Sequence, residues 1–117
     1  MRFRSMQMEV SDLNQANAFY SRLFGVPGKF DRDVFFFDFD GGRILLQKPR
    51  KDYMKPHPQT GVSFEIADFD EALARGEELA KALEDVGEFQ FSGLVGMVMF
   101  SITDVDGNNL TFFREGS

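Results

Sequence analysis

The 117-residue sequence has no cysteine and no tryptophan, and it has a single histidine. Without cysteine there can be no disulfide framework and no thiolate metal site, which favours a reducing, cytoplasmic location. The one imidazole belongs to His57, in the proline-rich segment K-P-H-P, and it cannot supply the pair of histidines that His-based zinc and iron sites use. We therefore interpret His57 as a surface loop residue, and nucleophilic triads are excluded in practice.

Long apolar runs and an excess of basic residues are also absent. No stretch is long enough to span a bilayer, and the first residues lead directly into a patterned strand, so we expect neither a signal peptide nor a membrane partner. The formal net charge of -6 argues against a nucleic-acid partner. Basic residues do crowd into segment 48–55, which we interpret as a solvated linker.

The two halves of the chain share a pattern of residues. Residues 5–12 read S-M-Q-M-E-V-S-D, and residues 61–68 read G-V-S-F-E-I-A-D. In each stretch apolar residues alternate along a strand, a Glu occupies the matching place, and an Asp opens a helix. Each half later has a D-x-D-G turn, at 38–41 and at 104–107, followed by a second apolar strand. The sequence is therefore an internal duplication.

Apolar periodicity predicts two helices and the strands around them. The first helix is expected to begin near Asp12 and to end at Gly25. The second is expected to begin at Asp68 and to end at Gly87. Further strands are expected near Phe30 and at 34–39, 43–47, 89–91, 97–103 and 109–114.

Each half is thus predicted to be β-α-β-β-β, which makes the fold class α+β. At this length the chain is expected to form a single domain, residues 1–117, with one real core. We expect a first βαβββ module at 1–50, a connector at 51–60 and a second βαβββ module at 61–117.

The duplicated pattern resembles the glyoxalase, bleomycin-resistance and extradiol-dioxygenase superfamily, whose members are also called vicinal oxygen chelate proteins. The resemblance covers nearly the whole chain. It implies two modules joined as a partly closed, barrel-like mixed sheet with helices on the outer face, a site on the concave face, and a homodimer. Three stretches carry it: V-S-D-L at 10–13 running on to L-F-G at 23–25, F-E-I-A-D at 64–68, and T-D-V-D-G-N at 103–108.

Alternation along the strands predicts which residues line that concave face. If Met8 and Val10 pack under the first helix, then Ser5, Gln7 and Glu9 point the other way. Glu9 and Glu65 lie near strand ends, where contact with solvent is the alternative reading. By the same logic the predicted ligand-binding residues, with Arg43 foremost, are Ser5, Gln7, Arg43, Gln47, Ser63 and Thr111.

The resemblance also implies where a metal site would lie. In metal-dependent members a His or similar ligand stands seven residues before the strand-end Asp, and a Glu stands four residues after the turn Gly. The two places for the His-type ligand carry Ser5 and Gly61. The two places for the Glu carry Leu45 and Thr111. Hydroxyl groups are poor ligands for divalent transition metals, and the side chains of Gly and Leu have no ligand atom. We therefore expect no metal and no cofactor.

The leading hypothesis is a metal-independent binding protein of the bleomycin-resistance type that holds a small aromatic or amphipathic molecule. The alternative is a lyase, isomerase or dioxygenase that depends on an unusual metal site or on Glu9 or Glu65 as a proton carrier. A third reading is a collapsed cavity filled by Phe35 and Phe37.

Overall fold

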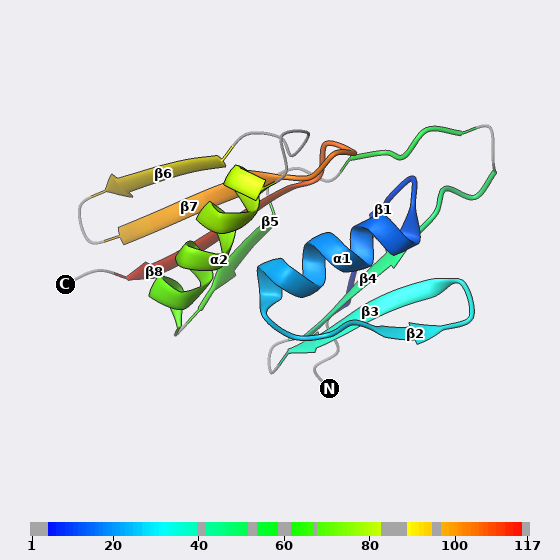
Figure 1. Ribbon diagram of the computed structural model, residues 1–117, viewed down its shortest axis with the longest axis horizontal. Helices are drawn as coiled ribbons and strands as arrows, with labels where there is room; N and C mark the ends of the chain where they lie inside the picture. Colours follow the sequence, from blue (N-terminus) through cyan, green and yellow to red (C-terminus); the bar gives the residue numbers. More distant parts are fainter. Residues whose placement is uncertain are drawn as a thin grey trace. The chain divides into compact units, whose positions relative to one another are not determined.

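The computed structural model describes residues 5–39, 42–51, 54–58, 62–66, 68–82, 89–94 and 97–115. It divides the chain into two compact units, Met1–Pro58 and Gln59–Ser117. Each unit runs strand, helix, strand, strand, strand, as the duplication predicts (Figure 1). The predicted α+β class with two βαβββ modules is therefore confirmed. In the described part of the chain, neither helix is long and apolar enough to cross a membrane.

The first unit is a four-stranded sheet with one helix. Along the sheet the strands lie in the order β1-β4-β3-β2. Strand β1 is parallel to β4, and the remaining neighbours are antiparallel. The elements are β1 (Ser5–Glu9), α1 (Leu13–Phe24), β2 (Lys29–Asp31), β3 (Val34–Phe39) and β4 (Gly42–Gln47).

Helix α1 has the ends that the sequence predicts. The Asp12 carboxylate accepts a hydrogen bond from the backbone N–H of Gln15 at 3.0 Å, which caps the free N-terminal amides. At the other end Gly25 has a φ of 73° and donates its N–H to the Ser21 carbonyl, a left-handed cap that suits glycine. The helix buries Ala16, Phe19, Tyr20 and Leu23.

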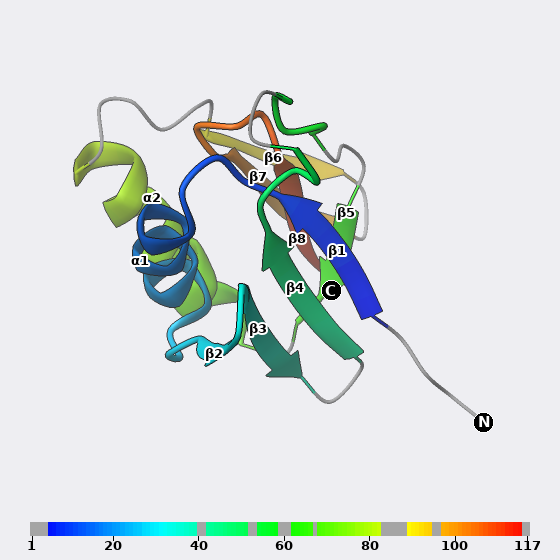
Figure 2. The same ribbon diagram turned by 90° about the vertical axis from the view of Figure 1, so that its right-hand side faces the viewer.

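Helix α1 packs on one face of its sheet (Figure 2). The ring of Phe37, which is 1% exposed, lies 5.0 Å from the ring of Phe24 on the helix. Phe37 pairs with Ile44, and Phe35 pairs with Leu46, so all four lie on the buried helix side. The suggestion that Phe35 and Phe37 fill the concave face is therefore wrong.

The second unit repeats this plan with the strand order β5-β8-β7-β6, and β5 is parallel to β8. The rings of Phe69 and Phe100 are 5.6 Å apart, and those of Phe100 and Phe112 are 4.9 Å apart, which joins the helix to the sheet. The predicted helix end at Gly87 lies outside the described residues. The elements are β5 (Val62–Glu65), α2 (Phe69–Ala82), β6 (Phe89–Leu94), β7 (Met97–Thr103) and β8 (Asn109–Glu115).

The two D-x-D-G patterns do not form equivalent turns, which corrects the expectation from the sequence. Asp38 lies within β3 and pairs with Arg43, whereas Asp104 follows β7 and is 6% exposed. In the second unit Thr103 is the residue that pairs with Asn109. Residues 39–42 connect the first pair and residues 104–108 connect the second, so the second connection is one residue longer. The counterpart of Asp38 in the sheet is therefore Thr103.

Candidate functional site

The face of the first sheet opposite α1 is called the first open face. Strand pairing places its positions in three rows across the sheet. Because alternate residues of a strand share a face, these rows define what a ligand would meet. The rows are Ser5, Arg43 and Asp38; Gln7, Leu45, Phe36 and Lys29; and Glu9, Gln47, Val34 and Asp31.

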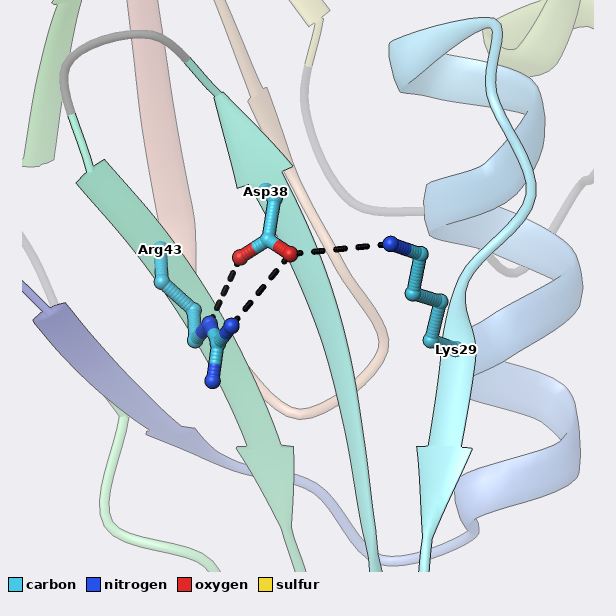
Figure 3. A network of polar contacts seen from close by, with 3 residues as sticks. All are labelled: Lys29, Asp38 and Arg43. Atoms are coloured by element: carbon cyan, nitrogen blue, oxygen red, sulfur yellow. Dashed lines mark hydrogen bonds and ion pairs between the residues drawn. The ribbon is translucent and has the colours of Figure 1, made fainter.

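A charged cluster occupies the hairpin end of this face (Figure 3). The Arg43 Nε donates to Asp38 Oδ1 at 2.6 Å, and Arg43 Nη2 donates to Asp38 Oδ2 at 3.3 Å. The Nζ of Lys29 lies 3.8 Å from Asp38 Oδ2. The hydrogen bonds from Arg43 and the charges of both cations lower the pKa of Asp38 below its usual 3.8. Asp38 is therefore an anion at neutral pH, and it contacts the Nε side of the Arg43 guanidinium.

Arg43 also contacts an aromatic ring. Its guanidinium carbon lies 4.4 Å from the centre of the Phe36 ring, within cation–π range. The side chain of Arg43 nevertheless remains 46% exposed. Arg43 thus contacts Asp38 and Phe36 while its side chain stays partly exposed.

The other predicted residues of the first open face have separate roles. Gln47 Nε2 donates to Gln7 Oε1 at 3.5 Å, which joins two amides across the sheet. The half-buried Glu9 accepts a hydrogen bond from the backbone N–H of His57 at 3.1 Å. Glu9 therefore ties the end of β1 to the connecting segment, and His57 contributes its backbone to that contact. Of Ser5 only the position in the strand is described, opposite Arg43.

The second sheet has its own open face, opposite α2, and it is mainly uncharged. Strand pairing places Ser63, Thr111 and Ser101 in one row. Beside them Asn109 Nδ2 donates to Thr103 Oγ1 at 2.9 Å. Glu65, at the end of β5, is exposed, which agrees with the alternative expectation that it contacts solvent. This face brings together two of the predicted ligand-binding residues, Ser63 and Thr111.

The positions where the resemblance implies metal ligands do not make a donor set. Leu45 lies opposite Gln7, and Thr111 lies opposite Ser63. Gly61 is outside the described residues. Aliphatic and hydroxyl side chains do not fit a divalent transition metal, which prefers imidazole, thiolate or carboxylate. Among the residues that the structure describes, no three His, Asp or Glu side chains gather as a metal cluster.

Sequence reasoning missed two members of the charged cluster, Lys29 and Asp38, and also the ring of Phe36 that contacts Arg43. The signal was partly present, because Asp38 is the one charged residue of V-F-F-F-D-F at 34–39, and alternation puts Phe36 on the same side of the strand. That alternation would have placed Phe36 and Asp38 beside Arg43 once the hairpin pairing was known. Apart from Asp38, residues 34–39 are apolar on both sides of the strand. The sequence therefore did not show that Phe35 and Phe37 face the helix.

The architecture defines a class of proteins in which one chain forms two βαβββ units. Solved structures of other proteins share this fold. No protein-family model matches the sequence, and no curated protein matches it. The chain is similar to a glyoxalase/bleomycin resistance protein from Albidiferax ferrireducens at 18% identity and a TM-score of 0.80, over 97% of this chain and 98% of that one.

Two further solved structures give the same picture. A glyoxalase/bleomycin resistance protein from Catenulispora acidiphila has 18% identity and a TM-score of 0.76, over 99% of this chain and 100% of that chain. A protein described as oxidase ChaP-H1 has 14% identity and a TM-score of 0.74, over 99% of this chain and 97% of that chain. The resemblance read from the sequence is therefore confirmed at the level of the fold, which is that of glyoxalase/bleomycin resistance proteins.

Proposed function

We propose that this protein binds a small organic molecule on an open sheet face and releases it unchanged, without a metal ion or another cofactor. The observation that carries the proposal is Arg43, which Asp38 holds at 2.6 Å over Phe36 while 46% of its side chain stays exposed. Ordering a long side chain costs entropy when a ligand binds, and here that cost is met before binding. A half-exposed arginine that already has these two contacts is a ready partner for a ligand.

Other polar residues on each of the two open faces support the same proposal. Gln7 and Gln47 present amide groups on the first open face, and Ser63 and Thr111 present hydroxyl groups on the second. Such groups can donate and accept hydrogen bonds, which gives orientation and specificity to a bound molecule. Proteins described as bleomycin resistance proteins share this fold, and a binding role is consistent with that description.

The alternative function is an enzyme of the lyase, isomerase or dioxygenase type, and structures described as oxidases also share the fold. Two observations favour binding over this alternative. Leu45 and Thr111 stand where the carboxylate ligands of metal-dependent members are expected. The carboxylate of Glu9 accepts a hydrogen bond from the connecting backbone, a structural task that competes with carrying a proton.

Metal addition separates the two functions. A metal ion at about a hundred times its dissociation constant would stabilise the folded state by about 2.7 kcal/mol. We expect that adding zinc, nickel, iron or manganese leaves the melting temperature unchanged, and that metal analysis of protein purified without chelator finds less than stoichiometric amounts. A rise of several degrees that vanishes in Glu9→Gln or Glu65→Gln would support the enzyme instead.

Ligand screening tests the binding function directly. A thermal-shift screen with a mixed set of metabolites and antibiotics is expected to yield a hit whose isotherm saturates in titration calorimetry. Arg43→Ala should weaken a hit that bears an acidic group by roughly 1.5 to 3 kcal/mol. The matched control is Arg22→Ala, because Arg22 is exposed on helix α1, away from the open face, and should leave affinity unchanged.

Mass spectrometry of the incubated hit then distinguishes a binder from an enzyme. We expect the ligand to be recovered intact after prolonged incubation with the protein. A new product whose formation is lost in Glu9→Gln or Glu65→Gln would overturn the binding function. A screen without any saturable, Arg43-dependent hit would overturn it as well.

A further inference from the structure

We infer that the ligand of the first open face is a small amphipathic monocarboxylate, an inference that rests on the proposed function. Two surfaces of different chemistry adjoin there. One is the outward edge of the Arg43 guanidinium, and the other is a group of apolar side chains on the neighbouring rows. A molecule that matches both surfaces needs an anionic head and an apolar body.

The guanidinium edge fits a carboxylate. Asp38 uses the side of Arg43 formed by Nε and Nη2, at 2.6 and 3.3 Å. A guanidinium has five N–H donors in a planar fork, so the edge formed by Nη1 and Nη2 keeps a parallel pair of donors. Nη1 points away from Asp38 (Figure 3). A carboxylate can therefore bind that edge in a bidentate manner while Asp38 stays in place.

The charges of the face favour one negative charge on the ligand. Arg43 and Lys29 are cations and Asp38 is an anion, so their cluster has a net charge of one positive on a chain whose net charge is -6. Two acidic residues, Asp31 and Glu9, stand in the row farthest from this cluster. A second carboxylate reaching toward that row would meet like charges, which weakens binding.

Apolar side chains stand beside the charged cluster in the middle row and in the acidic row. Phe36 and Leu45 are paired neighbours in the middle row, and Val34 follows in the next row on β3. All three are half-buried, so each still exposes part of its apolar surface. Covering that surface with an apolar body is favourable by the hydrophobic effect, whereas a bare anion leaves it in water. Both halves of the ligand thus have a partner.

Three probes separate the contributions of charge and body. Naphthoate has a carboxylate and an apolar ring system, naphthamide has the same shape without the charge, and acetate has the charge without the body. In titration calorimetry we expect naphthoate to bind at least about tenfold more tightly than either of the others, since a charge-assisted hydrogen bond contributes roughly that factor or more. Equal affinity for naphthoate and naphthamide, or for naphthoate and acetate, would overturn the inference.

Two variants test the geometry. Arg43→Lys keeps the positive charge but removes the fork, and it is expected to reduce naphthoate affinity about tenfold and leave naphthamide unaffected. Leu45→Ser is expected to weaken naphthoate and leave acetate unaffected. The control is Arg22→Lys, on α1, which should change neither. Full naphthoate affinity in Arg43→Lys would show that a point charge suffices and would overturn the bidentate contact.

The result is distinguishable from failure of the proposed function. If the screen yields saturable, Arg43-dependent hits and naphthoate binds no better than naphthamide, the binding function stands and the monocarboxylate class falls. If no molecule in the screen binds in an Arg43-dependent way, both fall. Circular dichroism and the melting temperature of each variant exclude misfolding as the cause, because Arg43 is an exposed side chain.

Discussion

The carboxylate of Glu9 accepts a hydrogen bond from the backbone N–H of His57, across 48 residues of sequence, at 3.1 Å. The contact joins the end of β1 to the segment that follows the first sheet. The carboxylate of Glu9 therefore has a structural role that does not depend on catalysis. The contribution of His57 to this contact comes from its backbone.

Removing this contact is expected to cost stability. Glu9→Ala should lower the free energy of unfolding by about 1 kcal/mol, whereas Glu9→Gln retains an acceptor oxygen and should cost less. Urea unfolding measures both values. Glu65→Ala is the matched control, because Glu65 occupies the corresponding place in the second sheet and is exposed, and it should change stability by less than about 0.5 kcal/mol. A larger loss in Glu65→Ala than in Glu9→Ala would contradict the assignment.

The lowered pKa of Asp38 predicts a dependence of stability on pH. Because hydrogen bonds from Arg43 hold the folded-state pKa below 3.8, Asp38 stabilises the fold at pH values above its unfolded pKa. That contribution is lost as the pH falls through the lower, folded pKa. Asp38→Asn should therefore lose less stability than the wild type between about pH 4 and pH 2.

Carboxyl NMR gives the direct measurement of this pKa. In the wild type Asp38 should titrate below 3.8, and in Arg43→Gln it should titrate closer to that value. An Asp38 that titrates at the same pH in both proteins would show that the Arg43 contact does not persist in solution.

The buried turn of the second unit should be more sensitive to mutation than its counterpart in the sequence. The Asp104 carboxylate accepts from the N–H groups of Asp106 and Asn108 and from the Asn108 side-chain amide, at 2.8 to 2.9 Å. Asp104→Ala would leave these donors without that partner and should cost about 2 to 3 kcal/mol in unfolding free energy. Asp38→Ala, at the equivalent place in the sequence but exposed, should cost clearly less. Equal losses would mean that the two turns are alike in solution.

Assembly is a separate prediction, which rests on the resemblance and on exposed apolar side chains. Phe30 is 58% exposed on the three-residue edge strand β2, and Val26 and Phe39 are 44% and 41% exposed. A small protein gains by covering such groups and strand edges, so we expect a homodimer. Light scattering at micromolar concentration should give about twice the 13.3 kDa mass of one chain. A mass of one chain would refute the dimer.

Much of the fold could be read from the sequence, because its signals are local. Asp12 and Gly25 set the ends of α1 through caps that depend on a few neighbouring residues. The faces of β1 could be assigned because Met6, Met8 and Val10 alternate with polar residues. These features follow from short-range stereochemistry and from one-sided burial.

The remainder of the candidate site depends on pairing between strands. Apart from Asp38, strand Val34–Phe39 is apolar on both of its sides. Alternation of apolar and polar residues therefore could not show which side faces the helix. Asp38 reaches Arg43 and Lys29 only because three strands lie side by side in a particular register. The bond from His57 to Glu9 involves a backbone N–H, which leaves no signature in residue type.

The pair at the hairpin end of each sheet records how the two copies have diverged. In the first copy the pair is Asp38 and Arg43, and in the second it is Thr103 and Asn109. One extra residue in the second connection leaves Asp104 outside the sheet and brings the neutral Thr103 to the place that Asp38 has in the first sheet. A difference of one residue between two strands thus accompanies an ionic pair in one unit and a neutral pair in the other. The length of one turn is therefore enough to give two copies of the same unit different surface chemistry.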